Sequence, residues 1–216
     1  MKQSAKSFLV LKYPSLKCLS SFLDSHIKVY KKKIEGDSVI TTKVEGTLNA
    51  SAEKLFKMMT DLPTMQKCDL PLKNLKCVEQ HSRNSDTIYF EMKVPFPMSN
   101  RDILNQRIYL GNKEDSALVK ELGLYDWGHT YYVILNQSVE RADCPPQKGI
   151  VRANTKMNFW LIEEDQRESG KTKVTQVVSQ DMGGSIPASV LNSIGAKGAT
   201  KRFEGIMENY GKLYKA

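Results

Sequence analysis

The sequence predicts an α+β protein with a helix-grip fold, in which a curved antiparallel β-sheet wraps around a long C-terminal helix and leaves an internal hydrophobic cavity. Three observations predict it. Short alternating or β-branched segments fill the middle of the chain, an amphipathic helix begins near residue 51, and the end of the chain changes to a three- and four-residue apolar period. A curved sheet packed on one helix leaves space for a ligand along its concave face.

The expected strands follow one another along the chain, with turn residues between them. The first two, His26–Ile34 and Ser38–Leu48, show apolar alternation and β-branched side chains, respectively. Further strands are expected over residues 72–80, 87–94, 103–109, 130–138, 150–163 and 171–180. Between the third and fourth of these, residues 111–128 form a long connection, with a short helix expected over 116–122.

Helix signals bracket this run of strands. Ser51 can cap a helix whose first turn carries an acid and which ends before Pro63. A C-terminal helix of roughly 25 residues is expected, with Pro187 in its first turn, because apolar residues up to Tyr214 recur at helical spacing. A third, short helix is expected over Ser15–Asp24.

The 216 residues suit one domain, which we place over residues 26–216 after an N-terminal segment of residues 1–25. The basic, serine-rich start partly resembles an organelle transit peptide. Pro14 would interrupt a long amphipathic helix there, and arginine is absent from the segment. We therefore expect a frayed basic start before the short helix, with organelle targeting as the alternative.

The charge balance is basic, with 32 Lys and Arg against 24 Asp and Glu and a net charge of +8. Such a surface favours polyanions, either nucleic acid or an anionic membrane. The basic run Lys31–Lys33 lacks interleaved aromatic residues for base stacking, so nucleic acid is not expected as a partner. No apolar run is long enough to span a membrane.

The four cysteines and three histidines are scattered without metal-ligand spacing. We therefore expect no metal and no cofactor, and reduced thiols in a cytoplasmic protein. No histidine falls on an expected cavity face, and Cys144 has no base close to it in sequence. Catalytic residues are accordingly not expected.

Three stretches share one resemblance. They are Val94–Asp102 (VPFPMSNRD), Pro145–Arg152 and Asp181–Pro187. In order and spacing they resemble the START (steroidogenic acute regulatory-related lipid transfer) domain family, and the first is similar to its phosphatidylcholine transfer protein branch. The resemblance implies a helix-grip fold, a tunnel for one lipid, no catalysis, and a gate formed by the C-terminal helix and the Pro95–Asn100 loop. Arg101 and Asp102 are expected to pair at the loop base.

Phosphatidylcholine carriers of this family surround choline with aromatic side chains and hold its phosphate with an arginine. The matching positions here are Phe90, Ile103 and Lys156, with Met65 in place of the arginine. Only one of the three is aromatic, and cation–π attraction is the main means of holding choline. Strong choline selectivity is therefore not expected.

Alternation along the strands extends the set of side chains that face the cavity. The expected lipid contacts are Phe90, Met92, Ile103, Asn105, Arg107, Tyr109, Lys156 and Asn158. For Arg107 two partners remain open, a lipid phosphate and an internal acid. Glu91 is the nearest candidate acid, although strict alternation turns it outward.

The gate and the basic helix are expected to touch the membrane. The residues assigned to this contact are Phe96, Met98, Leu191, Lys197, Lys201, Arg202 and Phe203. The expected function is non-enzymatic binding of one phospholipid and its transfer between membranes, by a monomer that associates transiently with anionic membrane surfaces. The alternatives are a sterol carrier or a lipid sensor, and with less support a hydrolase or cyclase of the same fold.

Overall fold

The computed structural model describes residues 17–21, 27–33, 39–68, 72–94, 98–124, 127–184, 186, 201 and 203–214. These residues form one ten-stranded sheet in the order β1-β2-β3-β10-β9-β7-β6-β5-β4, with β8 added beside β6. The strands are β1 Lys17–Ser21, β2 Ile27–Lys33, β3 Ile40–Leu48, β4 Leu72–Ser82, β5 Ser85–Met92, β6 Arg101–Gly111, β7 Tyr131–Ser138, β8 Val151–Arg152, β9 Asn154–Glu164 and β10 Thr172–Asp181.

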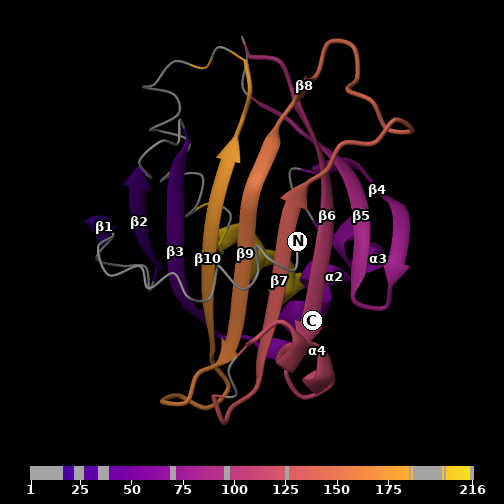
Figure 1. Ribbon diagram of the computed structural model, residues 1–216. Helices are drawn as coiled ribbons and strands as arrows, with labels where there is room; N and C mark the ends of the chain where they lie inside the picture. Colours follow the sequence, from indigo (N-terminus) through magenta and orange to yellow (C-terminus); the bar gives the residue numbers. More distant parts are fainter. Residues whose placement is uncertain are drawn as a thin grey trace.

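The sheet curves, and most of the helices lie across its concave face (Figure 1). The helices are α2 Ala52–Thr60, α3 Leu62–Gln66, α4 Ser116–Glu121 and a C-terminal helix over residues 203–214. All strand pairs are antiparallel except β6 with β8. The predicted helix-grip fold is thereby confirmed. The first half of the predicted last helix, up to residue 200, lies outside the described residues.

Helix α2 begins where the sequence predicts it. The Ser51 side chain accepts a hydrogen bond from the Lys54 N–H at 3.4 Å, so it caps the first turn. Asp61 ends α2 and at once caps α3, accepting from the Thr64 N–H at 3.0 Å. This second, short helix was not predicted, because Pro63 indicates the end of one helix and equally suits the first turn of the next.

The helix predicted over Ser15–Asp24 is wrong. Residues 17–21 form strand β1, which pairs antiparallel with β2, Cys18 lying opposite Tyr30. A helix of about ten residues is marginal in water without a packing partner. The open edge of β2 offers this segment backbone hydrogen bonds instead. The predicted strand over 150–163 is likewise divided into β8 and β9 at Ala153.

The concave face of the sheet packs against α2 and the C-terminal helix. Phe203 is fully buried and stacks on Trp160, with ring centroids 5.9 Å apart. A Cβ at Gly46 would lie 3.2 Å from the Phe203 ring, so the glycine permits this close approach. The Tyr210 hydroxyl accepts a hydrogen bond from the Ser51 N–H at 2.8 Å. These contacts hold the C-terminal helix to both the sheet and α2.

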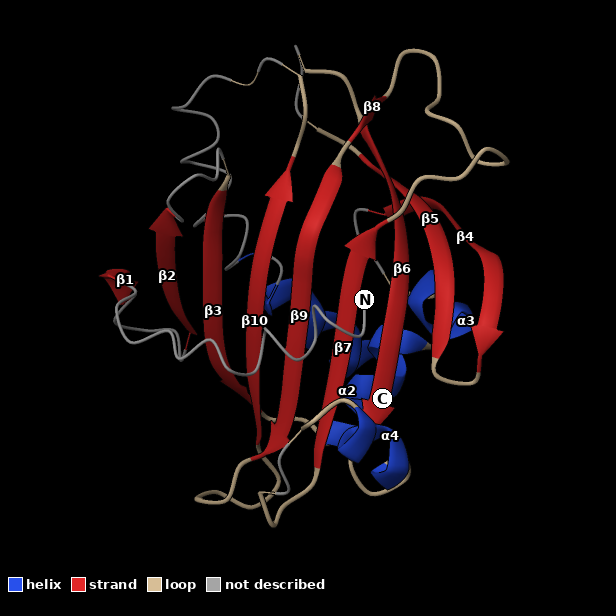
Figure 2. Ribbon diagram, viewed as in Figure 1, coloured by secondary structure: helices blue, strands red, loops and turns tan. Residues whose placement is uncertain are grey.

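The opposite face carries a second, smaller apolar cluster beneath α4. Figure 2 shows α4 at the lower end of the sheet. Val119 and Leu122 pack there against Tyr131, Val133 and Leu135 of β7. Part of the long connection after β6 thus covers the outer face of the sheet. None of the helices in the described part of the chain is both long and apolar enough to cross a membrane.

Candidate functional site

Strand register places most of the predicted inward-facing residues on the concave face. Tyr109 packs against the same core as the C-terminal helix, so alternation along β6 turns Ile103, Asn105 and Arg107 to that face as well. Phe90 lies directly opposite Ile103 on β5 and shares its side of the sheet. Met92, at the end of β5, is half-buried.

Arg107 lies at the centre of this face, with a side chain only 1% exposed. Its Nε and Nη2 donate to the two carboxylate oxygens of Asp86 at 2.7 and 2.5 Å. Nη2 also donates to the Thr60 carbonyl at 3.0 Å, and Nη1 lies 3.4 Å from the Met59 carbonyl. Nη1 is also 3.5 Å from the Met65 sulfur. A guanidinium has five N–H groups, and all five have a protein partner here.

The internal partner of Arg107 is therefore Asp86, not Glu91. The two residues lie directly opposite each other in the β5–β6 ladder. Glu91 faces outward, where its carboxylate accepts from Asn74 at 2.8 Å and from Tyr89 at 3.1 Å. Asp86 lies just before the strand predicted over residues 87–94, so alternation along that strand does not include it. The register of β5 against β6 would have identified Asp86 as the partner of Arg107.

Tyr109 extends this pair toward the sheet edge. Its hydroxyl lies 3.5 Å from the Asp86 carboxylate and accepts from the Gln80 side chain at 3.3 Å. Burial raises the pKa of Tyr109, so the hydroxyl stays protonated at neutral pH and can donate to Asp86. The Arg107 guanidinium also lies 5.2 Å from the Tyr109 ring.

A belt of amides and hydroxyls crosses the concave face beside the ion pair. The Asn105 side chain donates to Thr155 at 3.2 Å and accepts from Ser138 at 3.0 Å. Farther along, Asn136 donates to the Asn158 backbone carbonyl at 3.1 Å. Gln176 donates to the Asn158 side-chain oxygen at 2.8 Å. Sequence analysis found Asn105 and Asn158 but missed the others, since their contacts depend on how β6, β7, β9 and β10 align.

Lys156 does not lie inside. Its side chain is exposed, whereas the neighbouring Thr155 is 2% exposed and reaches Asn105. The cause is a bulge between β9 and β10, where Met157 pairs with Ser179 but Thr155 pairs with Gln180. The extra residue resets the alternation of β9, so the inward position predicted for Lys156 passes to Thr155.

The predicted membrane contacts are placed as follows. Lys201 is exposed and Met98 is half-buried. Phe203 is a correction, because a side chain with no exposed surface that stacks on Trp160 belongs to the core. Phe96, Leu191, Lys197 and Arg202 lie outside the described residues.

The three sequence stretches that carry the family resemblance meet at one end of the sheet. Asp102, fully buried, accepts a bidentate pair of hydrogen bonds from Arg152 at 2.9 and 3.0 Å. This carboxylate raises the pKa of Arg152. Arg101 donates to the carbonyls of Met182 and Gly183 at 2.9 and 3.0 Å. The expected Arg101–Asp102 pair is thus replaced by two separate contacts that tie the loop base to the other two stretches.

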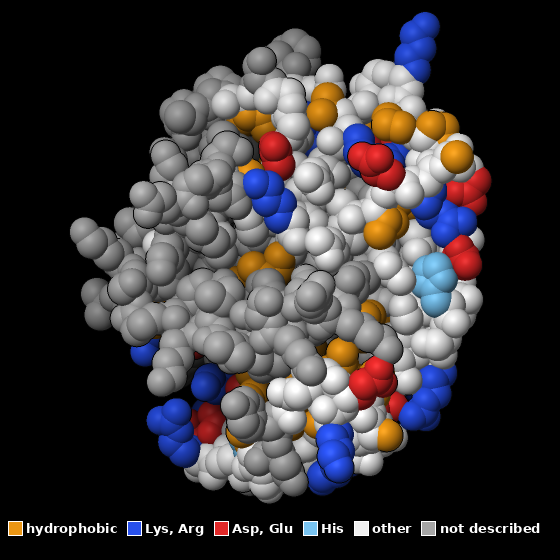
Figure 3. Space-filling model, viewed as in Figure 1, with side chains coloured by type: hydrophobic (Ala, Val, Ile, Leu, Met, Phe, Trp, Pro, Cys, Tyr) orange, Lys and Arg blue, Asp and Glu red, His pale blue; other side chains and the backbone are white. Residues whose placement is uncertain are grey.

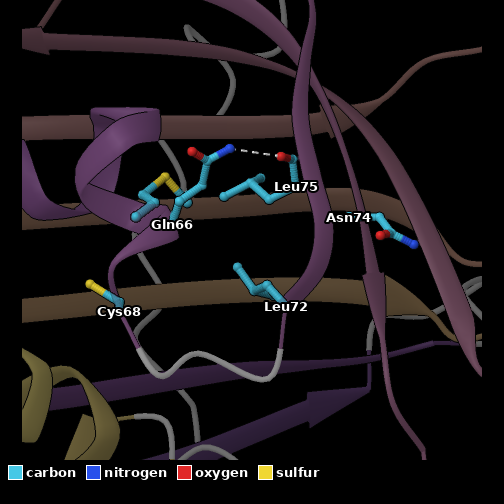
Figure 4. Close-up of a pocket in the computed structure, with 6 residues that line it drawn as sticks. Gln66, Cys68, Leu72, Asn74 and Leu75 are labelled. Carbon is cyan, nitrogen blue, oxygen red and sulfur yellow. Dashed lines mark hydrogen bonds between the residues drawn. The ribbon is translucent and has the colours of Figure 1, made fainter.

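A small pocket opens between α3 and the start of β4 (Figure 4). Its volume is about 290 Å³, and its lining residues are Met65, Gln66, Cys68, Leu72, Asn74 and Leu75. The Gln66 side chain crosses to the Leu75 carbonyl at 3.1 Å. Met65 borders the pocket and also contacts Arg107, so it separates the pocket from the buried ion pair.

The START domain family model matches residues 17–214, nearly the whole chain. The chain belongs to the START domain family. It is 27% identical over 165 residues to the human START domain-containing protein 10, covering 76% of this chain and 48% of that protein. It is also 25% identical over 192 residues to the phosphatidylcholine transfer protein of Mus musculus, covering 87% and 82% of the two chains. The chain therefore spans about half the length of the first of these relatives.

Solved structures agree on the fold. The crystal structure of human STARD10 superposes with a TM-score of 0.79 at 22% identity, covering 99% of this chain and 80% of that one. Human StAR-related lipid transfer protein 5 gives a TM-score of 0.81 at 13% identity, covering 99% and 96%. The chain is also 24% identical to the ceramide transfer protein of Mus musculus, covering 79% of this chain and 28% of that protein. Homologues named for lipid transfer thus associate this domain with lipid binding.

Proposed function

We propose that this chain binds one phospholipid between the concave face of its sheet and the C-terminal helix, and transfers it between membranes without chemical change. The observation that carries the proposal is the belt of amides and hydroxyls beside the Asp86–Arg107 pair on the concave face. Buried polar groups are ordinarily saturated by protein partners. Hydrogen bonds among the described residues engage the Asn136 side-chain nitrogen and the Asn158 side-chain oxygen. The other polar atom of each amide is then available to a ligand.

The charges on this face favour a headgroup without net charge. Arg107 and Asp86 neutralise each other, and Lys156 lies outside. For Arg107 to hold a lipid phosphate, its contacts with the carboxylate and two carbonyls would have to break, which is costly in a buried site. The belt offers neutral hydrogen bonds instead. A zwitterionic phospholipid therefore fits better than an acidic one, although only Phe90 is aromatic among the three positions that match the choline-binding ones.

We propose that transfer uses the Pro95–Asn100 loop and the C-terminal helix as the gate. The loop base is held by Arg101, which also holds the residues that lead toward the last helix. A shared anchor of this kind couples the two parts of the gate. Replacing Phe96 and Met98 by serine is expected to slow transfer and leave the melting temperature nearly unchanged.

Two neighbouring residues of β9 provide the test of ligand position. Native mass spectrometry with lipid extraction would identify the bound lipid, and fluorescent-lipid exchange between vesicles would measure transfer. Asn158→Ala should weaken binding about two- to tenfold, because a neutral hydrogen bond is lost. Lys156→Ala is the matched control on the exposed side and should bind like the parent. Purified protein without lipid and without transfer activity would overturn the proposal.

A sterol is the second candidate. The specific observation in its favour is the buried Asp86–Arg107 pair, which could meet a single ligand hydroxyl at the carboxylate. Competition among phosphatidylcholine, phosphatidylserine, phosphatidic acid and cholesterol distinguishes the two. Cholesterol displacing the phospholipids would favour the sterol, and displacement by phosphatidylcholine would favour the phospholipid.

A further inference from the structure

Three lysines stand on the outer face of the β4–β5 edge of the sheet. They are Lys73 and Lys76 on β4 and Lys93 immediately after β5, and all three are exposed. Lys73 lies opposite Glu91 in the ladder, and Lys93 follows two residues later on the same side. Figure 3 shows basic, acidic and histidine side chains along this edge, at the right of the view.

Lys73 and Lys93 are diagonal neighbours across the β4–β5 ladder, and Glu91 lies opposite Lys73 in it. Proximity of the Lys93 ammonium lowers the pKa of Lys73, which is the expected effect of one positive charge on another. Neither lysine forms an ion pair with any residue that the structure describes. Lys76 differs, because its ammonium lies 5.2 Å over the ring of Tyr89.

The carboxylates around this edge already have partners. Glu91 accepts from Asn74 and Tyr89, and Asn74 reaches it from a left-handed conformation with φ of 53° in a β4 bulge. Glu91 therefore offsets the charge of Lys73 only in part. Farther along β4, Glu79 is bound by Arg141, which also holds Asp143 at 2.8 Å. The two lysines remain available to an external anion.

Their position relates them to the gate. Lys93 immediately precedes the loop that joins β5 to β6, and the Val94 N–H donates to the Asn100 side chain at 3.3 Å across the base of that loop. The pair thus lies at the same end of the sheet as Arg101 and the junction of the three sequence stretches. The Gly111 end of β6, with α4, is the opposite end.

We propose that Lys73 and Lys93 form a membrane-docking surface that binds the phosphate groups of acidic lipids beside the gate. This inference deepens the proposed transfer function and rests on it. Two adjacent ammonium groups attract the negative charge that acidic phospholipids carry, and a bilayer presents many such headgroups at its surface. The surface is separate from the interior site, so acidic lipids bind the outside of the protein at the membrane and are not the transferred ligand.

Vesicle binding tests the surface directly. The full chain is titrated with phosphatidylcholine vesicles and with vesicles that also contain phosphatidylserine. Lys73→Gln/Lys93→Gln should bind the acidic vesicles about 20- to 30-fold more weakly. Each lysine near the membrane contributes a factor of about five in affinity, and the two factors multiply. Lys73→Arg/Lys93→Arg should restore binding. Lys113→Gln/Lys120→Gln removes the same charge from exposed positions at the opposite end of the sheet and should change affinity no more than about twofold.

Two readouts separate this surface from the interior site. Bound lipid, measured by native mass spectrometry, should be unchanged in Lys73→Gln/Lys93→Gln, because neither lysine faces the interior. A parent protein that bound acidic vesicles through this pair but carried no lipid would overturn only the proposed function. Equal losses in the two glutamine variants would overturn the docking surface. Tight binding of inorganic phosphate, without binding of acidic vesicles, would also overturn it, since the pair would then serve a soluble anion.

Discussion

Removing the Arg107 guanidinium should lower the free energy of unfolding by far more than it lowers the free energy of lipid binding. Arg107→Met would leave the Asp86 carboxylate, 1% exposed, without its two strongest donors, and would free the Thr60 carbonyl at the end of α2. Breaking a buried ion pair by removing one partner costs about 3–5 kcal/mol. For a chain of this size each kcal/mol lowers the melting temperature by about 2–4 °C, so a decrease of about 6–20 °C is expected.

A double variant separates the pair from its surroundings. Asp86→Leu/Arg107→Met removes both charges and should recover most of the lost stability, because apolar replacement of a buried pair is often nearly neutral. Urea unfolding followed by tryptophan fluorescence and circular dichroism would give the three free energies. The reasoning is refuted if Arg107→Met costs less than about 1 kcal/mol while lipid affinity falls ten- to a hundredfold, since a charged hydrogen bond to the ligand would account for that loss.

Three further predictions concern the junction, the C-terminal helix and an edge thiol. Gly183→Ala should lower the melting temperature more than Gly170→Ala. Both glycines have positive φ, which costs an alanine about 1–2 kcal/mol of stability. Only at Gly183 would the new Cβ also clash, at 2.9 Å from Val151, since nothing lies within 4 Å at Gly170. Tyr210→Phe should lower the free energy of unfolding by about 0.5–1.5 kcal/mol and speed amide hydrogen exchange at Ser51, because it removes the hydroxyl that accepts from the Ser51 N–H. Tyr214→Phe is the control and should be nearly neutral. Equal effects of the two variants would mean that the hydrogen bond adds no stability. Partial desolvation raises the pKa of the Cys77 thiol on the exposed β4 edge, so its alkylation at pH 8 should be slower than that of a free thiol, as measured against Cys77→Ser. Alkylation at pH 8 as fast as that of a free thiol would contradict this.

Local signals in the sequence determined the order of the elements. Alternation and β-branching identified the strands from β2 to β10, with β8 and β9 predicted as one, and the Ser51 cap identified the start of α2. The three short stretches also identified the family, because their order and spacing are properties of the chain itself. Each of these signals acts over a few residues, so none depends on what lies across the sheet.

Partners across the sheet were decided only by the tertiary structure. A single bulge in the β9–β10 ladder turned Lys156 outward, and alternation within β9 alone could not reveal it. Asp86 became the partner of Arg107 because β5 and β6 align those two residues, although they are distant in sequence. Residues 17–21 became a strand because the edge of β2 was available to pair with them. Register and edge pairing depend on two segments at once, which is why the chemistry of the interior required the folded chain.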